Sequence, residues 1–473
     1  MASDRYGLIG GLVADRPVVV SLVMAFGLTA LAVAGVADPS AALRASASFP
    51  EFIIAILAYS TIPAMLAAAT PRRLGPSLFF VGLVWMLFVV APIFAPFAAV
   101  APAAFSLNAG ATLAALTTLL IMSGPVVGAT IRFAFVASAS AALGMAGAMG
   151  MMELDRIGGE AAGPVATIGF GLGAFVGIGA AADFAMLFAR GAEAKRAAGV
   201  AARYGLAPAI YAAILAASAY GLAYFVPQST IDALSLAGAG GAAAFLASVS
   251  ALFATAGSLS LRRPIETLAV RENKRQQSFR KFWRPFRRLL PPSSAMAFAA
   301  ILGIATIAAV FNLEHAVSPT QLVFIVIAAA ASSVVFLSVR AGLFVLALLG
   351  TGSVFLNWFW DVARAPALTQ LDEIAACALA AALFAQLAVA WREARNPRLN
   401  ARETTEAALS DVVPPYVVCV IMGAAGMLGA EASGLWLNGA AVSARFLMLA
   451  LYGLLIAPAV MTTLSRSSRR DYA

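Results

Sequence analysis

The chain has 473 residues, of which 62% are hydrophobic and only 11% are charged. Soluble domains carry about 25% charged residues, so a water-facing globular domain is excluded. The formal net charge is +9, and the segment 262–288 alone holds ten Lys and Arg residues against two Glu. A basic segment beside a membrane is typical of an orientation signal rather than of a nucleic-acid site, so no nucleic-acid partner is expected.

Apolar runs recur along the whole chain and indicate an all-α polytopic membrane protein, since each span needs about 18 or more apolar residues. Lipid cannot satisfy backbone polar groups, and the short alternating segments of a barrel are absent from the sequence. Residues 1–16 are expected to be a tail before a retained first span rather than part of a cleaved signal peptide. The fourteen expected spans are 17–36, 51–70, 76–96, 108–127, 131–152, 165–189, 205–226, 233–260, 294–312, 321–339, 341–360, 373–391, 411–430 and 440–463.

Loop charges support this count, because Lys and Arg concentrate on the cytoplasmic side. With the N-terminus inside, even-numbered spans return to basic loops such as 190–203, 262–288 and 392–402, whereas the opposite loops carry acids such as Glu153 and Asp372. The exceptions, on or near the outer side, are Arg44, Arg156, Arg364 and Arg445. We therefore predict a multi-pass protein of a bacterial-type inner membrane, with both termini cytoplasmic.

The chain also shows an internal similarity. Arg72-Arg73-Leu74 precedes six expected spans, and Arg287-Arg288-Leu289 precedes another six. Both units start from the cytoplasm, so the repeats would be parallel and related by an axis along the membrane normal. The predicted parts are an N-terminal tail and helix pair (1–71), a first six-helix repeat (72–261), a basic cytoplasmic linker (262–293) and a second six-helix repeat with the C-terminal tail (294–473).

The basic linker interleaves aromatic residues with its charges at helical spacing, as in Phe279, Phe282 and Phe286. This pattern favours a helix lying on an anionic leaflet, but Pro285 interrupts it, so a disordered basic linker remains the alternative. In either form the linker would contact membrane lipids. The basic residues assigned to the membrane surface are Arg262, Arg263, Lys274, Arg275, Lys281, Arg284, Arg287 and Arg288.

Asp183 is the candidate functional residue. An acid at the centre of a transmembrane run costs roughly 2.5–3.5 kcal/mol, and such a residue usually faces a bundle interior or water, where it can exchange a proton. The alternative is that Asp183, seven residues before Arg190, leans towards the interface. On the same segment Gly169, Gly173 and Gly177 recur every four residues, which predicts close packing against another helix.

Other polar residues in the spans have simpler explanations. Cys377 and Cys419 lie inside apolar runs and are expected to be small packing residues. The single histidine, His315, stands in a short loop, so we expect no metal site, and no cofactor either. Asn357 and Trp360, near the outer end of a span, are typical of an interfacial anchor.

The stretch from Gly177 to Arg190 carries a family resemblance. Gly177-Ile-Gly179-Ala-Ala-Ala-Asp183-Phe184 followed by Arg190 resembles the fourth transmembrane segment of the RND superfamily, particularly its MMPL-like branch. The similarity continues to about Leu261, and a weaker copy runs over 372–466. In that family two six-span repeats move substrates using proton flow through intramembrane acids, so the resemblance implies a transporter with Asp183 as the protonatable residue.

Two features differ from the family pattern. The matching place in the second repeat falls near Ala385, beside Gln386, where neither an acid nor a lysine is found. The family's large extracytoplasmic porter domains are missing, and only 97–107 and 313–320 occupy their places. The expectation is therefore the membrane core of an RND-like protein without porter domains, working alone or with partner subunits that supply soluble domains.

We predict an RND-like inner-membrane transporter of a lipid or other hydrophobic molecule, and not an enzyme. One alternative is a non-transporting membrane scaffold, which the missing second-repeat acid favours. Another is a fourteen-span lipid or polysaccharide flippase. A third is a membrane-embedded lipid-linked glycosyltransferase, although its acids, as in Glu153 and Asp372, would stand on loops too short to fold.

The topology can be tested with single cysteines that replace Glu153 and Arg275. A membrane-impermeant thiol reagent should label the two positions from opposite sides, because an odd number of expected spans separates them. Labelling of both from the same side would refute the topology.

Overall fold

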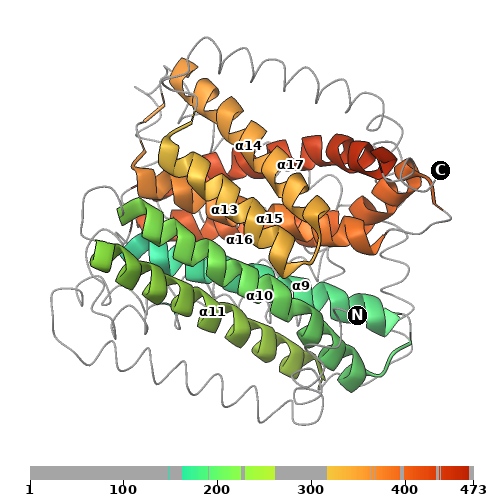
Figure 1. The fold of residues 1–473 in the computed structure, drawn as a ribbon. Coiled ribbons are helices and arrows are strands. Elements are labelled where there is room, and N and C mark those ends of the chain that lie inside the picture. The colour runs from blue at the N-terminus through green and yellow to red at the C-terminus, as the bar shows by residue number, and fades with distance from the viewer. Residues whose placement is uncertain are drawn as a thin grey trace, which may run out of the picture.

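A computed structural model describes residue 148 and the ranges 162–189, 191–224, 230–260, 317–363, 365–366, 368–394, 399–432, 436 and 438–467. The described part is all-helical and contains no strand (Figure 1). Its helices are α9 (Ala162–Ala189), α10 (Ala194–Tyr224), α11 (Thr230–Ser260), α13 (Pro319–Val335), α14 (Val339–Val362), α15 (Gln370–Glu393), α16 (Ala401–Ala432) and α17 (Gly439–Ser467). The basic linker, the ninth expected span and, apart from Ala148, the first five lie outside the described residues.

Each expected span from 165–189 to 233–260, and from 321–339 onwards, coincides with one of these helices. By length and composition, six of them can cross a membrane: α9, α10, α11, α14, α15 and α17. α13 is shorter, and α16 contains a short apolar stretch, Pro415–Ala424. The described part thus supports a polytopic membrane protein, while the total of fourteen spans stays a prediction.

Local hydrogen bonds explain where the later helices begin. Thr369 and Asp372 form a capping box at the start of α15, in which each side chain accepts from the other residue's backbone N–H. Asn400 and Glu403 make the same reciprocal pair before α16, at 2.8 and 2.9 Å. Such boxes satisfy N–H groups that have no partner inside the helix. The two capping boxes therefore fix the first residues of α15 and α16.

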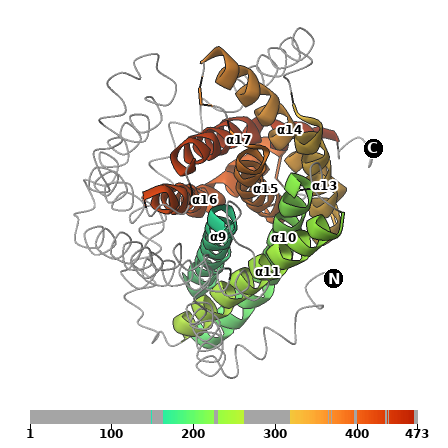
Figure 2. The same cartoon turned by 90° about the vertical axis from the view of Figure 1, so that its left-hand side faces the viewer.

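α15 is the central helix of the described fold. It packs against α9, α10, α13, α14, α16 and α17, and Figure 2, which looks along the bundle, shows these helices around it. From Ile374 to Ala385 every α15 residue is buried. Eight of these twelve residues are Ala or Cys: Ala375, Ala376, Cys377, Ala378, Ala380, Ala381, Ala382 and Ala385. Small side chains let the surrounding backbones approach closely.

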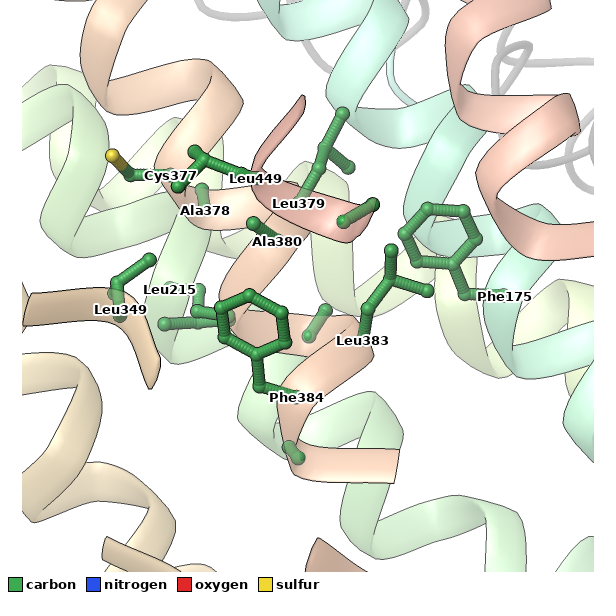
Figure 3. Close-up of a cluster of buried hydrophobic side chains, with 14 of the residues drawn as sticks. Phe175, Leu215, Leu349, Cys377, Ala378, Leu379, Ala380, Leu383, Phe384 and Leu449 are labelled. Atoms are coloured by element: carbon green, nitrogen blue, oxygen red, sulfur yellow. The ribbon is translucent and has the colours of Figure 1, made fainter. Parts of the chain in front are cut away.

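Larger apolar side chains fill the space around the middle of α15. Figure 3 shows Leu383 and Phe384 of α15 together with Leu215 of α10, Leu349 of α14 and Leu449 of α17. All five are fully buried, at 0% exposure. We call this group the apolar layer. It closes the centre of the bundle between the two ends of α15.

The glycines predicted to pack helices are buried in α9: Gly169, Gly173 and Gly177. Their role in helix packing stays a prediction. The close approach of α9 to α15 is instead seen at Gly171, where an added Cβ would lie 2.9 Å from a Leu379 methyl group. On the other side of α9, Gly426 of α16 accommodates the Phe170 ring, which would be 2.5 Å from its Cβ.

The helix contacts are reciprocal between the two halves of the chain. α9, α10 and α11 pack on one another, and so do α15, α16 and α17. Across the halves, α9 packs against α16 while α15 packs against α10, and α9 meets α15 directly. Parallel repeats would produce this exchange, but their first helices lie partly outside the described residues. The repeat layout and the domain boundaries therefore remain predictions.

Substitution of Gly453 tests the packing around the apolar layer. A Cβ on Gly453 would lie 2.0 Å from the ring of the fully buried Phe384, so Gly453→Ala should lower the free energy of unfolding by about 1–3 kcal/mol. Chemical denaturation in detergent micelles measures the effect. Gly350→Ala is the matched control, because nothing lies within 4 Å of its Cβ; equal losses in both variants would contradict this packing.

Candidate functional site

Asp183 lies in the last two turns of α9 and is half-buried. The next residue, Phe184, is fully buried and stacks on Phe188 with ring centroids 5.6 Å apart. The charge that acts on Asp183 is that of Glu393, the last residue of α15. Two carboxylates from different halves of the chain therefore lie within electrostatic range of each other, with Glu393 exposed at its helix end, and we call Asp183 and Glu393 the carboxylate pair.

A second contact joins the same two helices further along. Gln386 of α15 donates from Nε2 to the backbone carbonyl of Phe175 in α9, at 3.4 Å. Its side chain also hydrogen-bonds the thiol of Cys419 in α16. Phe175 and Asp183 are eight residues apart on α9, and Gln386 and Glu393 are seven apart on α15, so the two helices run parallel. Gln386 thus fills the place opposite α9 where the sequence has no second acid.

A larger group of polar side chains surrounds Arg445 of α17, which is 2% exposed. Its Nη1 lies 3.3 Å from Oε1 of Glu373 in α15. Its Nη2 donates to Oδ1 of Asn357 in α14, and its guanidinium carbon lies 5.5 Å from the ring centroid of Trp360. Breaking a buried pair by removal of one partner costs about 3–5 kcal/mol, so these contacts hold three helices together.

The polar contacts continue from Asn357 towards the bundle interior. Asn357 donates from Nδ2 to Oε1 of Gln321 in α13, at 3.1 Å, and Gln321 donates to Sγ of Cys377 at 3.4 Å. Ser353 lies 3.8 Å from the same sulfur. We call Arg445, Glu373, Asn357, Gln321 and Trp360 the Arg445 cluster. It joins four helices by hydrogen bonds and charge.

Asp372, next to Glu373, is buried, and both of its carboxylate oxygens accept hydrogen bonds. Its two carboxylate oxygens accept from Trp436 Nε1 and Asn438 Nδ2, each at 2.8 Å. It also accepts from the Thr369 backbone N–H in the capping box, at 3.1 Å. Asp372 therefore ties the start of α15 to the segment before α17. Its place in the fold is structural.

The carboxylate pair and the Arg445 cluster stand at opposite ends of α15. Glu373 and Glu393 are twenty residues apart on this helix, which is about 30 Å at 1.5 Å per residue. That length matches the hydrocarbon core of a bilayer. The apolar layer lies between them, around Leu383 and Phe384. In the predicted topology the Arg445 cluster faces the outside and the carboxylate pair the cytoplasm.

Sequence reasoning singled out Asp183 but missed the Arg445 cluster. Asn357 and Trp360 suggested an interfacial anchor, whereas Trp360 is buried and Asn357 bonds across helices. One feature of the sequence pointed to this cluster. Arg445 stands five residues inside an expected span, near the outer side, whereas most Lys and Arg residues lie in the cytoplasmic loops. A cation at that depth needs a partner, and Glu373 begins another expected span on the same side.

No metal centre is found in this part of the molecule. Among the residues that the structure describes, no group of three or more His, Cys, Asp or Glu side chains could hold a metal ion. Cys377 and Cys419 are both free and buried, on different helices.

Comparison with known proteins defines the fold. No protein-family model matches the chain, and neither does any curated protein sequence. Among solved structures it is similar to SecDF, a translocon-associated membrane protein from Thermus thermophilus, with a TM-score of 0.50 and 12% sequence identity. The match covers 82% of this chain and 62% of SecDF, so the chain spans less than two thirds of that protein. At this identity the likeness shows the fold alone, which is a helical bundle similar to that of SecDF.

Asp372 provides a test of the fold at this end of α15. Asp372→Ala would leave the Trp436 and Asn438 donors without their acceptor, which costs about 1–3 kcal/mol for a buried donor. The free energy of unfolding in detergent should fall by that amount. Asp361→Ala, which removes an exposed acid nearby, should leave it unchanged; similar losses in both would argue against the contacts of Asp372.

Proposed function

We propose that this chain is an RND-like transporter of a bacterial-type inner membrane that moves a lipid or other hydrophobic molecule and exchanges protons at Asp183. The observation that carries the proposal is the carboxylate pair, placed where α9 and α15 meet in a fold like that of SecDF. A single intramembrane acid can have a local structural cause. Two acids brought together from distant parts of the chain cost free energy, which favours a functional reason.

The composition of the bundle supports a hydrophobic substrate. The polar side chains of the described spans are largely engaged with one another, as in the Arg445 cluster, and the centre of the bundle is the apolar layer. A polar solute would need unengaged hydrogen-bonding groups along its route. Membrane lipids are then both the surroundings and the source of the substrate, while partner subunits would supply the soluble domains. No catalytic role and no cofactor is proposed.

Glu393 also bears on the scaffold alternative. That reading rested on the missing acid near Ala385 and Gln386. We propose that Glu393, eight residues after Ala385 on α15, takes the part of that missing acid, because its charge acts on Asp183. The MMPL-like branch and the membrane core without porter domains remain part of this proposal.

The substitution Asp183→Asn tests the proposal. In liposomes with a fluorescent phospholipid as transport probe, the purified protein should move protons and probe together, and Asp183→Asn should abolish the proton movement, because an amide cannot exchange a proton. Glu193→Gln, which changes an exposed acid beyond the end of α9, should retain it.

Unchanged proton movement in a well-folded Asp183→Asn variant would refute proton exchange at Asp183. Probe movement without any proton movement in the unmodified protein would favour the flippase alternative. Movement of neither would favour the scaffold.

A further inference from the structure

The Glu373–Arg445 pair has the geometry of a weakly held ion pair rather than of a locked one. Only Nη1 of Arg445 reaches the carboxylate, at 3.3 Å. The Nε–H, although buried, has no acceptor among the described residues. A tight arginine–carboxylate pair is bidentate, with two parallel hydrogen bonds at about 2.7–2.9 Å. Glu373 is therefore held at one point, and its carboxylate can change state without breaking a rigid fork.

The surroundings of Glu373 permit its carboxylate to take up a proton. The charged groups that act on it are Arg445 of α17, its neighbour Asp372 and Asp361 at the end of α14. When Glu373 takes up a proton, the guanidinium of Arg445 keeps its hydrogen bond to Asn357 and its contact with the Trp360 ring. A buried cation left with no counter-charge would oppose protonation strongly. Here that penalty is reduced.

Access to the pair is one-sided. The side chain of Glu373 is 23% exposed, whereas that of Arg445 is 2% exposed. Protons from the adjacent aqueous side can thus reach the acid, while the cation stays sealed inside the bundle. Tyr452 and Thr351 share a 2.7 Å hydrogen bond from hydroxyl to hydroxyl at the level of the apolar layer, since Gly453, next to Tyr452, packs against Phe384. Along α15 the apolar layer stands between Glu373 and Glu393.

We propose that Glu373 is a second proton-exchanging carboxylate, restrained by Arg445, at the opposite end of α15 from Asp183. In the step itself, one proton from water adds to the Glu373 carboxylate to form the neutral acid, and the ion pair becomes a charge–dipole contact. Its release to water reverses the step. The exchange stands on the geometry of the pair alone; its part in transport rests on the proposed function.

Infrared difference spectroscopy of the reconstituted full chain tests the exchange directly. Lowering the pH should produce a protonated-carboxyl band that Glu373→Gln removes. Arg445→Lys keeps the charge but loses the hydrogen bond to Asn357, and it should shift the pH at which this band appears. A purely structural ion pair would show no such band, so its absence in the unmodified protein overturns the proposal even if Glu373→Gln folds poorly.

Glu431→Gln is the matched control. Glu431 is a half-buried carboxylate near the end of α16 whose partner is the Ala440 backbone N–H, without a guanidinium. This variant should leave the Glu373 band in place. If Glu431→Gln removes the band that was assigned to Glu373, the assignment fails.

Proton movement in liposomes separates this inference from the proposed function. Glu373→Gln should slow it about a hundredfold, the usual effect of removing one proton-transfer group, and Glu431→Gln should not. If the unmodified protein moves no protons but the Glu373 band still titrates, the proposed function fails and the exchange at Glu373 stands. If Asp183→Asn abolishes proton movement while Glu373→Gln changes neither movement nor band, Glu373 is structural and the proposed function survives.

Discussion

The enclosure of α15 by six other helices is the constraint on which the rest of the fold depends. The interior part of a helix surrounded on nearly all sides has little contact with lipid or water, so a polar group there needs a partner from another helix. Gln386 finds one in the Phe175 carbonyl of α9, and Glu373 finds one in Arg445 of α17. The small side chains of α15 make this enclosure possible, because they let helices from both halves of the chain approach it.

The same enclosure separates two polar regions. Between Glu373 and Glu393, α15 passes through the apolar layer, where Leu383 and Phe384 are fully buried. No hydrogen-bonded chain in the described residues crosses this layer. A protein that passes a proton from one region to the other must therefore change the packing of these side chains, and the densely filled interior allows discrete rearrangements rather than gradual ones. Such a change in packing would alter the close contact between Gly453 and Phe384.

Sequence reasoning predicted the spans of the described part well, because they follow from local composition. Their direction across the membrane stays a prediction. It could not predict which polar residues meet. Asn357 bonds to Gln321 across 36 residues and to Arg445 across 88, and no periodicity along one helix encodes such a pair. The search for a partner of Asp183 assumed equal positions in the two repeats and so stopped near Ala385. The charge that acts on Asp183 comes instead from Glu393, two turns further along α15.

Energetics make the Arg445 cluster hard to explain by stability alone. Replacement of a buried ion pair by apolar residues of similar volume is often neutral or stabilising, by about 1–4 kcal/mol, because the desolvation penalty disappears. Within the described part of the chain, the buried Nε–H of Arg445 has no acceptor, which costs free energy rather than contributing it. A charge kept at such a cost, beside a half-accessible acid and at the far end of the helix that meets Asp183, is better explained by a proton that comes and goes than by packing.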